Sequence, residues 1–147
     1  MPLRLRESLP GDFERLLEID RECFPPGIAY SRLELKFYMK RPGAFTLIAE
    51  LPEICGFIVA ELNRGRQGHV ITIDVLAAAR RLGVGTALLT ASEDRLRTAG
   101  ATRLHLETAV DNLPAIRFYK RHGYFLERTI PHYYANGVDA FVMSKDL

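Results

Sequence analysis

The chain has no apolar run that approaches the roughly 20 residues needed to span a membrane. Its N-terminal segment carries Arg4, Arg6 and Glu7 in the region where a signal peptide needs an uninterrupted apolar stretch. We therefore expect a cytoplasmic protein with no membrane partner.

Cysteine is scarce, and so is an excess of charge of either sign. Cys23 and Cys55 are too few for a disulfide framework and lack the nearby Cys or His of zinc sites, so we expect buried, reduced thiols. A net charge of +2 is too small to indicate nucleic acid, and no RNP-like, zinc-finger or Arg-rich segment accompanies it.

The histidines show no metal-ligand spacing. No H-E-x-x-H or comparable motif is present. The four are scattered as His69, His105, His122 and His132. The sequence therefore predicts no metal.

What is present fits one ordinary domain covering residues 1–147. The composition is 48% hydrophobic and 26% charged, without low-complexity bias. A chain of this length buries roughly 70% of its unfolded surface in one core.

The periodicity predicts strands and helices that form a mixed sheet flanked by helices. Ser31 and Glu34 form a capping-box pattern at the start of the second helix, and Asn136-Gly137 indicates the turn of a final hairpin. The expected strands are 3–6, 44–51, 54–62, 69–76, 103–108, 124–130 and 138–143. The expected helices are about 13–24, 31–41, 84–99 and 112–122.

The segment from Arg80 to Thr86 lies between a β-branched strand and a helix, an order that makes an anion site. Gly83 and Gly85 lack a Cβ, so backbone amides can approach phosphate oxygens closely. The first turn of the helix adds free N–H groups and the positive end of its dipole, and Arg80 and Arg81 add charge.

Two other phosphate loops compete with this interpretation. A P-loop needs Gly-Lys-Ser/Thr, which this segment lacks. A dinucleotide loop needs a small residue where Leu88 stands, although Glu107 lies roughly where a ribose-binding acid would. The dinucleotide interpretation stays open as a minor alternative.

Arg80-x-x-Gly83-x-Gly85 resembles the acyl-CoA signature of the GNAT superfamily of N-acetyltransferases, and the segment from Asn112 to Tyr124 resembles its following helix. The resemblance implies a GNAT-like mixed, mostly antiparallel sheet with about four helices, and acetyl-CoA as co-substrate. It implies cofactor contacts at Ile73, Val75, Arg80, Arg81, Leu82, Gly83, Val84, Gly85, Thr86, Asn112 and Tyr119.

The resemblance also implies catalytic residues. Tyr119 corresponds to the tyrosine that faces the coenzyme thiol and would protonate the leaving sulfur. Glu107 corresponds to the glutamate proposed as general base in the bacterial ribosomal-protein-alanine acetyltransferases. His105, two residues away on the same strand face, is the second choice of base.

The last third is similar to the protein N-terminal branch of the superfamily, in its Tyr133-Tyr134 pair and its Gly-x-Asp-Ala element at 137–140. This implies a protein or peptide N-terminus as substrate, held by Tyr30 and Tyr134. The turn from Phe24 to Tyr30 departs from the Phe-Pro-Trp type of the bacterial alanine enzymes. A small-molecule amine acetyltransferase and a non-catalytic acyl-CoA sensor remain alternatives, and the oligomeric state stays open.

Overall fold

A computed structural model describes residues 2–147. The strands form one sheet in the order β1-β2-β3-β4-β5-β7-β6, in which only β4 and β5 pair in parallel. The strands are β1 (Arg4–Glu7), β2 (Ala44–Glu50), β3 (Ile54–Leu62), β4 (Gln67–Val75), β5 (Arg103–Ala109), β6 (Phe125–Ile130) and β7 (Ala140–Asp146). The helices are α1 (Phe13–Cys23), α2 (Arg32–Met39), α3 (Val84–Thr98) and α4 (Leu113–Arg121), with 3-10 turns at Pro10–Asp12 and Ala77–Ala79. The expected mixed, mostly antiparallel sheet with four helices is confirmed.

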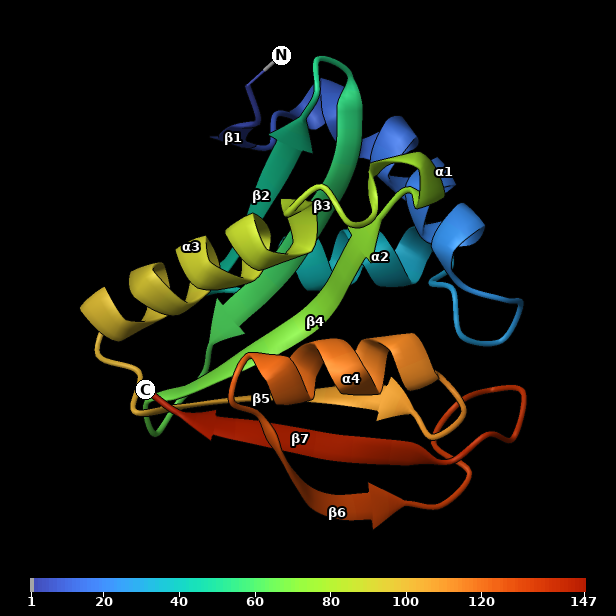
Figure 1. The fold of residues 1–147 in the computed structure, drawn as a ribbon, viewed down its shortest axis with the longest axis vertical. Coiled ribbons are helices and arrows are strands. Elements are labelled where there is room, and N and C mark those ends of the chain that lie inside the picture. Colours follow the sequence, from blue (N-terminus) through green and yellow to red (C-terminus); the bar gives the residue numbers. More distant parts are fainter. Residues whose placement is uncertain (1) are drawn as a thin grey trace.

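Two apolar layers cover the two faces of the sheet. α3 and α4 pack on one face over a core that includes Leu88, Leu104 and Leu106. α1 and α2 pack on the other face, where Leu16 and Phe57 are fully buried. Figure 1 shows α3 and α4 in front of the sheet and α1 and α2 behind it. No helix among residues 2–147 is both long and apolar enough to cross a membrane.

Local sequence signals explain most element boundaries. The Ser31 side chain accepts the N–H of Glu34, and the Glu34 carboxylate accepts the N–H of Ser31, so the predicted capping box begins α2. Asp12 directly precedes α1, but its carboxylate accepts the N–H of Leu9 and so caps the preceding 3-10 turn. Cys55 is buried and Cys23 half-buried, and neither forms a disulfide.

The final hairpin differs from the prediction. β6 and β7 do pair antiparallel, but β6 ends at Ile130 and β7 begins only at Ala140 and runs to Asp146. The connection is therefore a longer loop that carries Tyr133 and Tyr134, and the predicted turn at Asn136-Gly137 forms inside it, where the N–H of Gly137 donates to the Tyr134 carbonyl at 2.8 Å. Its bend is held by the N–H of His132, which donates to Asp139 Oδ1 at 2.8 Å.

β4 and β5 pair only at their beginnings. Gln67–Val70 pairs with Arg103–Leu106, after which β4 continues to Val75 and β5 to Ala109 with no ladder between them in the described chain. Figure 1 shows the two strands separating after this stretch. The backbone edge of β4 that faced β5 is thus left without a strand partner from Ile71 onward.

A bulge in β4 begins where the two strands part. Val70 pairs with Ala60 and Thr72 with Val59, so Ile71 is an extra residue. The hydroxyl of Tyr30 donates to the Ile71 carbonyl at 3.1 Å. After the bulge the alternation of side chains is shifted, so that Ile73 and Val75 pack toward the core under α3.

Candidate active site

The predicted anion loop forms where β4 passes into α3. Gly83 is the N-cap of α3 in the left-handed region, with φ of 80°, a conformation that costs a residue with a Cβ about 1–2 kcal/mol. Ala87 makes the first intrahelical bond, to the Gly83 carbonyl. The N–H groups of Val84, Gly85 and Thr86 therefore point from the helix N-terminus without an intrahelical acceptor.

Gly85 has a packing role, in addition to any role in letting the backbone approach a phosphate group. A Cβ at Gly85 would lie 3.2 Å from the ring of Phe118 on α4. The missing side chain therefore lets α3 and α4 meet, a constraint that the sequence reasoning did not assign to this glycine. No side chain lies within 4 Å of a Cβ built at Gly83, so only the backbone conformation requires glycine there.

The charged and capping residues around the loop are anchored locally. Arg80 Nε donates to the Val75 carbonyl at 3.1 Å, which fixes the Arg80 side chain beside the end of β4. Asn112, predicted to contact the cofactor, caps α4, since its Oδ1 accepts the N–H of Ala115 at 3.3 Å. Thr86 Oγ1 lies 3.1 Å from His122 Nε2 at the far end of α4.

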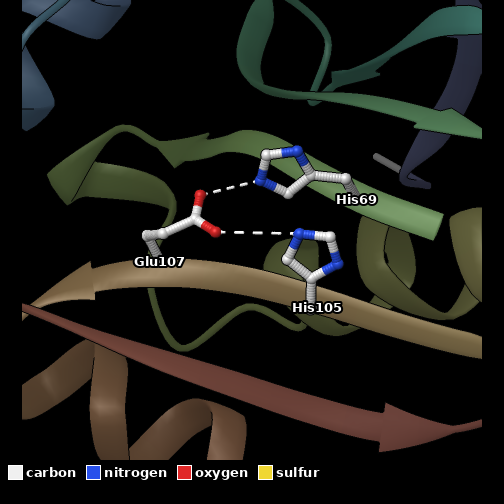
Figure 2. A group of neighbouring side chains, drawn as sticks. All are labelled: His69, His105 and Glu107. Carbon is white, nitrogen blue, oxygen red and sulfur yellow. Dashed lines mark hydrogen bonds and ion pairs between the residues drawn. The ribbon is translucent and has the colours of Figure 1, made fainter. Parts of the chain in front are cut away.

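The Glu107 carboxylate faces the edges of two histidine rings at the point where β4 and β5 part. His69 Nε2 is 2.7 Å from Glu107 Oε1, and His105 Nε2 is 3.8 Å from Glu107 Oε2. Figure 2 shows both rings directed at the one carboxylate. The rings are stacked, with centroids 4.3 Å apart and planes within 8°, because His69 and His105 are register partners of the parallel ladder.

The pKa values in this group follow from its crowding. Burial alone would raise the pKa of Glu107, but the hydrogen bond and charge of His69, with His105 and Tyr133, outweigh it and lower the pKa. Burial, and then the charge of His69, lower the pKa of His105. At neutral pH Glu107 is therefore a carboxylate able to accept a proton.

Tyr119 lies on α4 and is almost completely buried. Burial, and then the charges of Asp74, Tyr134 and Glu107, raise its pKa. Its hydroxyl makes no hydrogen bond to another group of residues 2–147. The phenol therefore stays protonated at neutral pH and keeps its proton free to be donated.

A groove of about 1010 Å³ lies between the α1–α2 loop and the β6–β7 loop. Tyr30, Tyr133 and Tyr134 line it, and the Tyr133 hydroxyl donates to Glu107 Oε1 at 3.4 Å. The two loops are joined by the N–H of Ala135, which donates to the Gly27 carbonyl at 3.1 Å. The structure thus brings together both segments that the sequence nominated for the substrate.

Tyr30 and Tyr134 differ in how they meet the groove. The Tyr30 hydroxyl is taken by the Ile71 carbonyl, and burial raises the pKa of Tyr30, so this ring forms part of the floor. Tyr134 packs edge-to-face on Tyr133 with centroids 4.9 Å apart. Tyr133 is the more exposed of the pair and the one that reaches Glu107.

Two buried carboxyl groups, Asp20 and Asp74, lie next to the residues that line the groove. Asp20 Oδ2 accepts the N–H of Tyr30 at 2.7 Å, and Asp74 Oδ1 accepts from Thr72 at 2.5 Å. Asp20 Oδ1 and Asp74 Oδ2 are buried with no other partner. Burial, and then the hydrogen bond and charge of Asp20, raise the pKa of Asp74 well above its usual range. One proton shared between the two carboxyls accounts for both oxygens.

The fold and this site define a class of enzyme. The chain matches the Acetyltransferase (GNAT) family over residues 13–124, and it belongs to this family. It is an acetyl-CoA-dependent acetyltransferase, and the dinucleotide interpretation of the glycine loop is set aside.

Particular relatives are similar over nearly the whole chain. An N-alpha-acetyltransferase of Sulfurisphaera tokodaii is 33% identical over 157 residues, covering 98% of this chain and 93% of that protein. N-alpha-acetyltransferase 30 of Schizosaccharomyces pombe is 30% identical, over 76% of this chain and 78% of that protein. The crystal structure of Ard1 from Thermoplasma volcanium superposes with a TM-score of 0.91 at 25% identity, over 100% of this chain and 99% of that chain.

Sequence reasoning missed His69 and Tyr133 as members of this site. His69 is 38 positions from Glu107 in the chain, so no linear motif joins them. A signal was available, since both expected strands, 69–76 and 103–108, begin near a histidine, and pairing them in parallel would have placed His69 beside His105. Tyr133 was noticed only as part of a pair in which Tyr134 was preferred.

Proposed function

We propose that this enzyme transfers the acetyl group of acetyl-CoA to the N-terminal α-amine of a protein or peptide. One observation carries the proposal. The groove between the α1–α2 and β6–β7 loops is lined in part by Tyr133, whose hydroxyl reaches Glu107. A chain end lying in that groove would present its amine to the carboxylate. The relatives named N-alpha-acetyltransferase support the same substrate class.

The base in this proposal is Glu107, assisted by His69. The ammonium form of the substrate must lose a proton before its nitrogen can attack. A carboxylate held ionised by neighbouring groups can receive this proton directly or through one water molecule. The 2.7 Å hydrogen bond to His69 Nε2 keeps the acceptor oxygen of Glu107 oriented. Tyr133 is a further donor to the same oxygen, so the carboxylate is positioned from two sides.

The acid in this proposal is Tyr119. The amine nitrogen attacks the thioester carbon, the carbonyl oxygen becomes an oxyanion, and collapse of this intermediate breaks the carbon–sulfur bond. The thiolate takes the Tyr119 proton, and the amine proton goes to Glu107. The pantetheine would bind the backbone of Ile73 and Val75, on the edge of β4 that β5 leaves uncovered.

The cofactor phosphates are assigned to the loop from Arg80 to Thr86. Arg81 and Leu82 precede Gly83, so their backbone lies beside the free amides of Val84, Gly85 and Thr86. Three amides at a helix N-terminus suit a pyrophosphate, whose charge the helix dipole also favours. Asn112 contributes by fixing the start of α4, which carries Tyr119.

An α-amine suits a modest base. Its pKa is about 7.7–8.0 against about 10.4 for a lysine side chain, so near neutral pH roughly a quarter of α-amines are already uncharged. Glu107 has a lowered pKa and is therefore a weak base. A weak base is adequate for an amine that is partly neutral, and it is a poor match for lysine.

The test is a panel of short peptides with free N-termini incubated with acetyl-CoA, with the product identified by mass spectrometry. Each peptide carries an internal lysine and has a matched control whose α-amine is formylated. We expect acetylation on the α-nitrogen of some free peptides and none on the formylated controls.

Two results would contradict the proposal. Equal acetylation of the formylated controls would indicate lysine as the acceptor. Acetylation of polyamines, amino acids or aminoglycosides without any peptide product would indicate a small-molecule enzyme.

The role of Tyr119 has its own test. If Tyr119→Phe bound acetyl-CoA and left turnover unchanged, Tyr119 would not be the acid.

A further inference from the structure

His69, His105 and Glu107 offer more than an acid–base pair. Each presents one ligand atom, and these atoms lie within 4.8 Å of one another. Two imidazole nitrogens and one carboxylate are the donor set of many catalytic zinc sites, in which three protein ligands leave a further position open. Figure 2 shows the two histidines converging on the carboxylate from neighbouring strands.

We propose that these three side chains bind one divalent transition-metal ion of the zinc type, and that the bound ion inhibits acetyl transfer. The inhibitory half of this inference rests on the proposed function, because it assigns the role of base to Glu107. The binding half rests on the geometry of the cluster alone.

The ligand atoms need only small movements to hold the ion. Zinc bonds to nitrogen and oxygen are about 2.0–2.2 Å, so ligand atoms of a tetrahedral site are about 3.3–3.5 Å apart. His69 Nε2 and Glu107 Oε1, now at 2.7 Å, would move apart by less than 1 Å on this basis. The side chains are 20%, 27% and 14% exposed for His69, His105 and Glu107, so an ion can reach them.

An outer partner is already in place for His69. A metal-bound histidine usually donates its other ring nitrogen to a carboxylate. His69 Nδ1 lies 3.7 Å from Glu61 Oε1, and the buried Glu61 is held by Arg41 Nε at 3.1 Å from its other oxygen. When His69 Nε2 binds the ion, the ring proton can lie on Nδ1, where it faces Glu61.

The bound ion would stop the reaction in two ways. It takes the lone pairs of Glu107 that accept the amine proton. It also adds two positive charges to the cluster, which repel an incoming ammonium group.

Metal binding is tested on tag-free, chelator-treated protein by cobalt titration. Co²⁺ gives a visible absorption band at a tetrahedral site, and Zn²⁺ competes it away. We expect one ion per chain. Separate His105→Gln and Glu107→Gln variants should weaken binding by at least about tenfold, since even changes behind the ligands cost this much. Cys23→Ser is the matched control for binding at a thiol outside the cluster, and its affinity should equal that of the wild type.

Inhibition is measured as acetylated peptide by mass spectrometry, because the free coenzyme thiol itself binds soft metals. Zn²⁺ should abolish turnover and a chelator should restore it, while Mg²⁺, which prefers oxygen ligands, should have no effect. The rate of each protein is expressed relative to its own chelator-treated rate. On this scale His105→Gln should need at least about tenfold more Zn²⁺ than the wild type for the same fractional inhibition.

Distinct results overturn each half. Absence of a cobalt band, or binding unchanged in both His105→Gln and Glu107→Gln, removes the site. Full turnover with the site saturated removes the inhibition. If no peptide is acetylated even with chelator, the inhibitory half falls with the proposed function, whereas the cobalt titration still decides the site.

Discussion

At the scale of single residues, Glu107 is held by three side chains: His69 on β4, Tyr133 in the β6–β7 loop and His105 on its own strand. His69 contributes the shortest contact, at 2.7 Å, and His105 a longer one at 3.8 Å. A carboxylate with a lowered pKa has little driving force to take a proton. The directly bonded His69 can share that proton, whereas His105 contributes mainly its packing and charge.

The first prediction separates the two histidines. Glu107→Gln should lower kcat about 10²–10⁴-fold at neutral pH. His69→Gln should lower kcat more than His105→Gln does, because His69, unlike His105, is hydrogen-bonded to Glu107. The loss in Glu107→Gln should shrink above about pH 9, where the α-amine is already neutral. The measurement is kcat and KM as functions of pH. A larger loss in His105→Gln would make His105 the base.

The Asp20–Asp74 pair connects the α1–α2 loop to β4 through a shared proton. Asp20 holds the Tyr30 N–H, and Asp74 lies between Ile73 and Val75. The pKa of Asp74 is raised in the folded protein. Its contribution to stability is therefore fully present below the unfolded pKa of about 3.9 and is lost as the pH rises toward the folded pKa.

The second prediction follows from that sign. Asp74→Asn carries an amide that can donate to Asp20 at every pH, so the free energy of unfolding relative to wild type should increase as the pH rises from about 4. Asp12→Asn is the control with the opposite sign. The hydrogen bond to Arg6 lowers the pKa of Asp12, so that stability is lost as the pH falls. Urea unfolding at several pH values measures the free energy of unfolding of both variants. If that free energy changed with pH in the same way in wild type and Asp74→Asn, the shared proton would be refuted.

At the scale of elements, the start of α3 depends on two glycines for different reasons. Gly83 supplies a left-handed backbone, and Gly85 supplies room for the Phe118 ring of α4. The same loop therefore shapes the anion site and sets the distance between α3 and α4.

The third prediction distinguishes these roles by a double-mutant cycle. Gly83→Ala should cost about 1–2 kcal/mol through backbone strain. Gly85→Ala should cost about 1–3 kcal/mol through overpacking. Phe118→Leu should offset part of the Gly85→Ala loss and none of the Gly83→Ala loss. Urea unfolding gives the free energies, and additive losses for the Gly85→Ala and Phe118→Leu pair would contradict the packing role.

At the scale of the whole molecule, the sheet has a parallel pairing at the β4–β5 junction, where the proposed active site lies. β4 and β5 share only a short parallel ladder, and the strands then part. A ligand bound in that opening contacts both halves of the sheet, so it should stabilise the folded protein as a unit.

The fourth prediction is a shift of thermal unfolding by acetyl-CoA. Ligand at 100 times its dissociation constant adds about 2.7 kcal/mol, which for a chain of this size raises Tm by roughly 5–11 °C. NAD at the same concentration is the control and should leave Tm unchanged. Stabilisation by NAD and not by acetyl-CoA would contradict the assignment of the loop.

The sequence alone was sufficient for features whose cause is local. A left-handed Gly83, the Ser31–Glu34 capping box and the strand–loop–helix order around Arg80 each depend on a few adjacent residues. Backbone propensity and hydrogen bonding over that range are therefore readable from the chain. The motif pair at 80–85 and 112–124 was enough to indicate the family.

Only the tertiary structure could decide the composition of the cluster of His69, His105 and Glu107. His69 meets Glu107 because β4 and β5 pair in parallel in one register, and a shift of one residue would turn these side chains to the other face. The bulge at Ile71 and the loop that brings Tyr133 to Glu107 are likewise set by strand pairing. These contacts join residues far apart in the chain, and their geometry is fixed by packing rather than by local preference.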